Sequence, residues 1–232
     1  KIYGNYNPSI YEFNLEGDLP SFHYGENRWD GLEISVVTND STASFMTTCE
    51  SLVAGSVLNM ENIKFSCNVD SDSLKYSLLW KNNDLEDISL GEIIGFTSFQ
   101  YRPSNQVPRI DIQINPGQIF IKDTIWELDE SGITIDTSSV DFHQLRVSHN
   151  KQSIAVNGIL SRQATDELHF NFSELDLEHL NNVTSKSGLL LDGVMNGTTT
   201  ISDVYNNPMF LSDISISNLF ISFPLKQRQP FK

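Results

Sequence analysis

Residues 109–159 read RIDIQINPGQIFIKDTIWELDESGITIDTSSVDFHQLRVSHNKQSIAVNGI, and their apolar pattern is the clearest indication of the fold. Apolar residues fall there on every second position, in short runs that polar or turn residues interrupt. Ile112 and Ile114 have polar neighbours on both sides, and Ile133 and Ile135 repeat the pattern. Because successive side chains of a strand point to opposite faces, this period of two predicts a sheet with one apolar and one polar face.

Similar runs occur along the whole chain, separated by turn-forming segments such as Asn115-Pro116-Gly117. Strands at intervals of about ten residues with short links favour an antiparallel meander or a β-solenoid-like sheet. A parallel α/β sheet would need helical crossovers, which the pattern does not contain. The predicted strands are residues 11–15, 32–37, 43–49, 63–69, 74–80, 92–99, 109–115, 118–121, 125–128, 132–136, 141–147, 153–160, 167–172, 189–201 and 214–223.

One short helix is expected at residues 174–180. Ser173 is a candidate N-cap, and the acidic residues that follow suit the positive end of a helix dipole. The sequence therefore predicts an all-β fold with at most one short helix.

Length and charge narrow the function classes. The chain has 232 residues, enough for one large all-β domain or two small ones with a sizeable core. Its formal net charge of −15 repels phosphate backbones, so no nucleic-acid partner is expected.

No apolar run approaches the roughly 20 residues of a membrane helix, and the chain begins at Lys1 without a signal-like segment. We expect a fragment or processed product that is soluble as it stands. Residues 1–232 are predicted to be a single elongated unit, and the polar stretch at residues 81–87 is the candidate for a sub-boundary.

The two cysteines, Cys49 and Cys67, fit no metal-binding spacing. Each has the parity of nearby apolar residues, which predicts buried free thiols. A disulfide between neighbouring strands is the alternative in an oxidising compartment.

No catalytic, cofactor-binding or metal-binding residues are predicted. The five histidines lack zinc-motif spacing, and no nucleophile elbow, phosphate loop or dinucleotide fingerprint occurs. Trp80 and Trp126 have the parity of apolar neighbours, which favours burial or the lining of an apolar groove over exposed sugar-stacking platforms.

The chain from Leu78 onward resembles the Bacteroidota form of the C-terminal domain of TamB, the translocation and assembly module protein (DUF490 family). The residues that carry the resemblance are 112–121, Trp126-Glu127-Leu128, Ile133-Thr134-Ile135-Asp136, Leu145-Arg146-Val147, 154–161, Leu175-Asp176-Leu177 and the stretch from Gly188 through Tyr205-Asn206-Asn207-Pro208, with an earlier fragment at residues 18–29. The resemblance covers about two-thirds of the chain and consists of strand patterns.

This resemblance implies a long sheet curled into a groove, the AsmA-like β-taco, with an apolar inside and a polar outside. It implies the periplasmic part of an inner-membrane-anchored protein of the Gram-negative cell envelope. It also implies a role in outer-membrane biogenesis by lipid transport or protein secretion. The expected partner is an Omp85-class outer-membrane barrel (TamA-like). The expected cargo is phospholipid acyl chains or the strands of unfolded outer-membrane proteins.

Our leading hypothesis is therefore a non-enzymatic domain that holds hydrophobic cargo in a curved β-groove. The predicted groove residues are alternating apolar ones: Ile112, Ile114, Ile119, Ile121, Ile133, Ile135, Leu145, Val147, Ile154 and Val156. The same residues would equally fill an ordinary closed core. The alternatives are a surface carbohydrate-binding or adhesin β-sandwich, closed between two sheets, and a hydrolase with carboxylates converging in a cleft.

Overall fold

A computed structural model describes residues 1–39, 41–54, 58–82, 88–101, 108–121, 124–184 and 188–223. The fold is all-β, as predicted. The strands are β1 (Ile2–Asn7), β2 (Glu12–Tyr24), β3 (Asn27–Thr38), β4 (Thr42–Ala54), β5 (Leu58–Asp70), β6 (Ser73–Asn82), β7 (Ser89–Tyr101), β8 (Pro108–Ile114), β9 (Gly117–Ile121), β10 (Thr124–Leu128), β11 (Ser131–Ile135), β12 (Ser139–His149), β13 (Gln152–Ser161), β14 (Glu167–Asp176), β15 (Leu190–Ser202) and β16 (Met209–Ser222).

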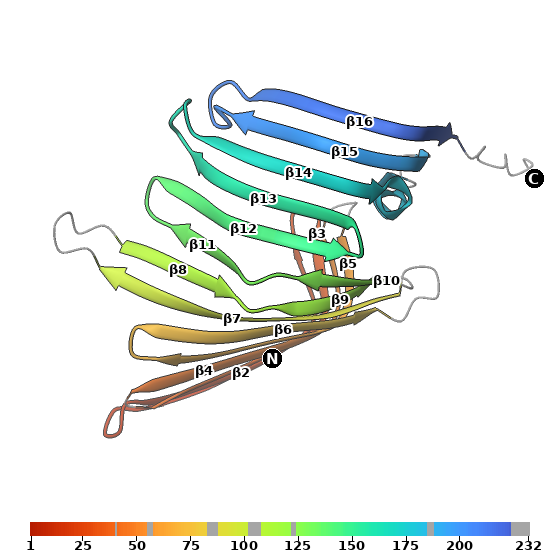
Figure 1. The fold of residues 1–232 in the computed structure, drawn as a ribbon. Coiled ribbons are helices and arrows are strands. Elements are labelled where there is room, and N and C mark those ends of the chain that lie inside the picture. Colours follow the sequence, from red (N-terminus) through yellow and green to blue (C-terminus); the bar gives the residue numbers. More distant parts are fainter. Residues whose placement is uncertain are drawn as a thin grey trace, which may run out of the picture.

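All sixteen strands belong to one curved antiparallel sheet, in which the chain runs from the β1 edge to the β16 edge (Figure 1). In the middle of the sheet a long hairpin is interrupted in both of its strands, so that its first strand consists of β8 and β9 and its second of β10 and β11. β8 and β9 both pair with β7, and β10 and β11 both pair with β12. Pro116 lies at the break between β8 and β9, where a residue without an N–H cannot take part in a ladder.

Cross-strand register shows which residues share a face. Ile133 on β11 lies opposite Ile112 on β8 and Phe142 on β12. Val147 on β12 lies opposite Ile154 on β13. Directly opposed residues of a ladder project to the same side, so apolar side chains form continuous rows across the sheet.

The rows of apolar side chains continue across several bulges in the strands. On β12, Phe142 pairs with Gly158 and Leu145 pairs with Val156, so the apolar position moves by three residues while the partner strand moves by two. Gln144 lies in this step with φ of 54°. Glu174 on β14 and Asn218 on β16 also have positive φ where their pairing shifts. Such bulges bend a strand and re-aim the following side chains.

The N-terminal strands show the same three-residue step. On β3 the apolar positions move from Leu32 to Trp29, with Gly31 between them at φ of 59°. On β2 they move from Leu19 to Phe22, and Phe22 then contacts its cross-strand partner Trp29 with ring centroids 5.3 Å apart. Neighbouring strands therefore share the same three-residue step in the spacing of their apolar residues.

The helix predicted at residues 174–180, with Ser173 as its N-cap, is wrong at its start. Residues up to Asp176 belong to β14, and only Leu177–Leu180 form a 3-10 helix (η1), followed by the four-residue α1 (Asn181–Thr184). Asp176, not Ser173, caps the helix by accepting a hydrogen bond from the backbone N of Glu178. Leu175 pairs with Met195 of β15 and is 1% exposed, so burial in the sheet outweighs the local capping pattern.

The predicted strand segments each fall on one of the strands β2–β16, while β1 was not predicted. Most of the candidate sub-boundary lies outside the described residues, which omit 83–87. On either side of it β6 and β7 stay paired as far as Asn82 opposite Ser89.

The bulge at Gln144 gives a test of the register. Gln144→Gly should stabilise the protein by up to about 1 kcal/mol, because glycine adopts positive φ without strain. Gln144→Val should destabilise it by about 1–3 kcal/mol, because a β-branched residue is strained there. Denaturant unfolding followed by circular dichroism measures both changes.

Gln118, an exposed residue within β9, is the matched control. There the order should reverse, since glycine weakens a regular strand and valine favours it. The same order of effects at both positions would contradict the bulge.

Candidate functional site, an uncharged apolar face

All ten predicted groove residues lie on one face of the sheet, which we call the apolar face. They come from β8, β9, β11, β12 and β13. Register connects them directly or through shared partners: Ile114 and Ile119 lie opposite Gly95 and Gly91, which share one face of β7.

The apolar face carries no charge over most of its extent. Among the described residues of β6–β16, register places no Asp, Glu, Lys or Arg on it. The charged residues of these strands project from the opposite face, for example Glu92, Asp111, Glu127 and Arg146. The charged side chains of this part of the sheet are therefore confined to one face, which also carries apolar residues such as Leu79 and Ile94.

The protein itself covers the apolar face only in part: all ten predicted groove residues are half-buried, and none of them is fully buried. Only seven apolar side chains of the described residues are buried: Cys49, Cys67, Trp80, Trp126, Leu128, Leu175 and Leu177. The accessible surface is 15649 Å², whereas a compact protein of this mass has about 10,600 Å². All described strands belong to one sheet, so the two-sheet core that the carbohydrate-binding or adhesin sandwich requires is not formed.

Two aromatic side chains lie flat against glycines on the apolar face. A Cβ added at Gly91 would come within 2.3 Å of the Trp80 ring, its cross-strand neighbour. A Cβ at Gly95 would come within 2.2 Å of the Tyr76 hydroxyl. Burial raises the pKa of Tyr76. The absence of a Cβ at these glycines leaves the space that the two aromatic side chains occupy against the sheet.

At one end of the strands, the segment after β14 folds over the apolar face. Trp126 of β10 is 5% exposed, and the His179 ring of η1 meets it edge-on with centroids 5.2 Å apart. The ring of His149 lies 6.0 Å away, and its Nδ1 is 2.7 Å from the carbonyl oxygen of Ile125. Leu177 of η1 is also buried. This end of the face is therefore closed, and the predicted burial of Trp80 and Trp126 is confirmed.

Both cysteines are buried free thiols, as the parity argument predicted. Burial raises the pKa of both thiols, so the neutral form is favoured. Cys49 lies within hydrogen-bond distance of the carbonyl oxygens of Asp30 and Ser51, at 3.3 and 3.0 Å.

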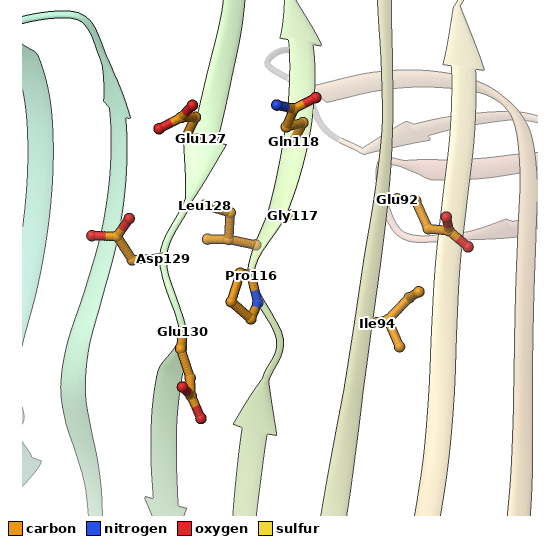
Figure 2. Close-up of a pocket in the computed structure, with 9 residues that line it drawn as sticks. All are labelled: Glu92, Ile94, Pro116, Gly117, Gln118, Glu127, Leu128, Asp129 and Glu130. Atoms are coloured by element: carbon orange, nitrogen blue, oxygen red, sulfur yellow. The ribbon is translucent and has the colours of Figure 1, made fainter.

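Carboxylates gather in a hollow on the polar face, next to the break in the central hairpin. Figure 2 shows Glu92, Glu127, Asp129 and Glu130 around Pro116, with carboxylates that do not converge on one point. In the part of the chain that the structure describes, no three His, Cys, Asp or Glu side chains form a group that could hold a metal ion. This arrangement gives no support to the hydrolase hypothesis.

The sequence patterns missed the distal halves of β2–β5. There Phe22, Trp29, Leu52 and Met60 form one cross-strand row. The signal that could have found them is the three-residue step in apolar spacing, which recurs in adjacent strands.

Within the described residues, no helix is long and apolar enough to span a bilayer. No protein-family model, no characterised protein and no solved structure matches the chain. The resemblance to the TamB C-terminal domain therefore stays a prediction.

Proposed function

We propose that this chain is a non-enzymatic domain that holds the acyl chains of phospholipids against its apolar face. The observation that carries the proposal is an extended face without charges whose ten predicted groove residues are only half-buried in the folded protein. Hydrocarbon is the cargo that such a surface suits, because it needs no hydrogen bonds and buries both partners' apolar area.

The expected energies permit reversible transfer. Burying a methylene group stabilises a complex by about 0.8 kcal/mol, so an acyl chain of about 16 carbons gains on the order of 10 kcal/mol. The same chain gains a similar amount inside a bilayer. Because the two environments are matched, transfer of a lipid between membrane and protein is nearly isoenergetic and therefore reversible. A charged side chain on the face would remove this match, since burying it beneath hydrocarbon is costly.

The cellular setting of the proposal rests on the TamB-like residues. We place the domain in the periplasm, as part of an inner-membrane-anchored protein of a Gram-negative cell. An Omp85-class outer-membrane barrel (TamA-like) is the proposed partner, and outer-membrane lipid transport is the proposed process.

Strands of nascent outer-membrane proteins are a second candidate cargo, favoured by the β16 edge. This edge strand has 14 residues and a single charged one, Asp213. Phe210, Leu211 and Phe220 are 68%, 77% and 63% exposed on it. An unpaired edge with apolar side chains on both faces can accept another strand by β-augmentation.

Dye displacement tests the acyl-chain proposal. The native protein should enhance the fluorescence of ANS, and palmitate or a phospholipid should displace the dye stoichiometrically. Weak ANS fluorescence that no lipid changes would contradict the proposal.

A pair of substitutions on adjacent positions of β13 tests which face binds. Ile154 lies on the apolar face opposite Val147 and Phe172, whereas Ala155 lies on the other face opposite Arg146. Ile154→Asp should reduce lipid binding at least tenfold, because the carboxylate would be buried beneath the acyl chain. Ala155→Asp should bind as the parent protein does.

Both variants should remain folded, because Ile154 is only half-buried and an aspartate there can reach water. Far-UV circular dichroism and a melting curve check this. If Ile154→Asp unfolds the protein, the residue belongs to a closed core and the face is not a binding surface.

A further inference from the structure

A polar hollow lies at the end of the strands opposite the one that η1 closes. It has a volume of about 490 Å³ and borders Val140 of β12 and Leu160 of β13. These two residues are cross-strand partners on the apolar face. The far end of the same hairpin holds His149, beside Trp126. The apolar residues of β12 and β13 thus form a strip along the hairpin. The hollow lies at its open end, and Trp126 lies at its closed end.

The carboxylates at this end already accept hydrogen bonds from their own turns. Asp136 accepts from the backbone N of Ser138 and Ser139 at 2.7 and 2.8 Å, and from both hydroxyls. These bonds lower the pKa of Asp136 to about 2. In the next turn Asp166 accepts from the Ser161 hydroxyl. The turns are thereby fixed, and their carboxylates are engaged.

Arg162 is the cation that lines this hollow. Arg28, Arg109 and Arg146 each pair with a carboxylate at 2.8 to 3.0 Å. Arg162 is exposed and has no ion-pair partner among the residues that the structure describes. Gln163 and the phenol of Tyr205, which is 58% exposed, line the same hollow. Asp136 also lines the hollow, but its carboxylate already accepts hydrogen bonds from Ser138 and Ser139, so Arg162, Gln163 and Tyr205 are the donors left beside the apolar face.

We propose that this hollow is a subsite for the anionic head group of a single lipid whose tail lies on the apolar face. This inference rests on the proposed function and adds the polarity and direction of the ligand. The Arg162 guanidinium donates to phosphate oxygens, and Tyr205 and Gln163 complete the set of donors. The tail runs along β12 and β13 toward Trp126.

The length of the strip fits this assignment. β13 has ten residues, from Gln152 to Ser161, and spans about 33 Å at about 3.3 Å per residue. The hydrocarbon of one bilayer leaflet is about 15 Å thick, half of a core of about 30 Å. A tail that begins at Leu160 therefore ends on the strip, before it reaches the closed end.

Two ligands that differ only by a phosphate test the subsite. Palmitoyl lysophosphatidic acid and monopalmitoylglycerol are titrated below their critical micelle concentrations by isothermal titration calorimetry. The parent protein should bind the phosphate-bearing lipid about tenfold more tightly, as expected for a charge-assisted contact. Arg162→Gln should abolish this preference and leave the affinity for monopalmitoylglycerol unchanged, and Arg162→Lys should restore part of it.

Arg146→Gln is the matched control, because Arg146 projects from the polar face of β12 and pairs with Asp129. It should keep the full preference. Inorganic phosphate alone, titrated to the same protein, should give no binding. Binding of inorganic phosphate that Arg162→Gln removes would assign a simple anion site and overturn the head-group subsite.

The outcomes separate the two proposals. If the parent protein binds both lipids equally, or if Arg162→Gln keeps the preference, the subsite is wrong while acyl-chain binding stands. If neither lipid binds the parent protein, the proposed function itself is wrong.

Discussion

The backbone ladder is the constraint on which this structure depends. Sixteen strands hydrogen-bond in one sheet, and no second sheet lies over it among the described residues. Side chains on the apolar face therefore bury one another mainly along the sheet, and few are fully buried. In such a fold the register carries unusual weight, because a slip by one residue would turn every apolar side chain of a strand to the charged face. The bulges obey this constraint. Where β12 gains a residue at Gln144, the apolar position moves from Phe142 to Leu145, and the row across the sheet continues.

The period of two made the strands and the shared face predictable from the sequence. The ten alternating residues from Ile112 to Val156 lie on one face because register in an antiparallel sheet preserves parity from strand to strand. The distal parts of β2–β5 were missed because Gly31 and the neighbouring steps interrupt that period. The start of the helix was misplaced because the pairing of Leu175 with Met195 outweighs the capping preference of Ser173.

The missing cover could not be predicted in the same way. Ile133 has the same pattern in a sandwich and in an open sheet, since alternation reports that one face is apolar and says nothing of what lies over it. The answer comes from the surface area, which is about half as large again as that of a compact protein of equal mass. Charge segregation adds a second distinction. On β6–β16 the charged residues lie on the polar face, and the whole chain has a net charge of −15, so like charge opposes association of copies through that face. The exposed edges at β1 and β16 lack this protection, apart from Asp213 and the bulge at Asn218.

An open apolar face also links stability to occupancy. A ligand that binds only the folded state stabilises it by RT ln(1 + [L]/Kd), which is about 2.7 kcal/mol at a ligand concentration of 100 times Kd. This is a large part of the 5–15 kcal/mol by which folded domains are usually stable. A lipid on the apolar face would take the place of the second layer that an ordinary β-sandwich builds from its own chain. Under the proposed function, the strands bury their apolar side chains only in part. The bound lipid would bury the apolar surface that remains exposed to water. The uncharged face and the high surface area then have the same explanation. A face that binds a lipid reversibly must stay accessible when the lipid leaves, and it must carry no charge that the lipid would bury.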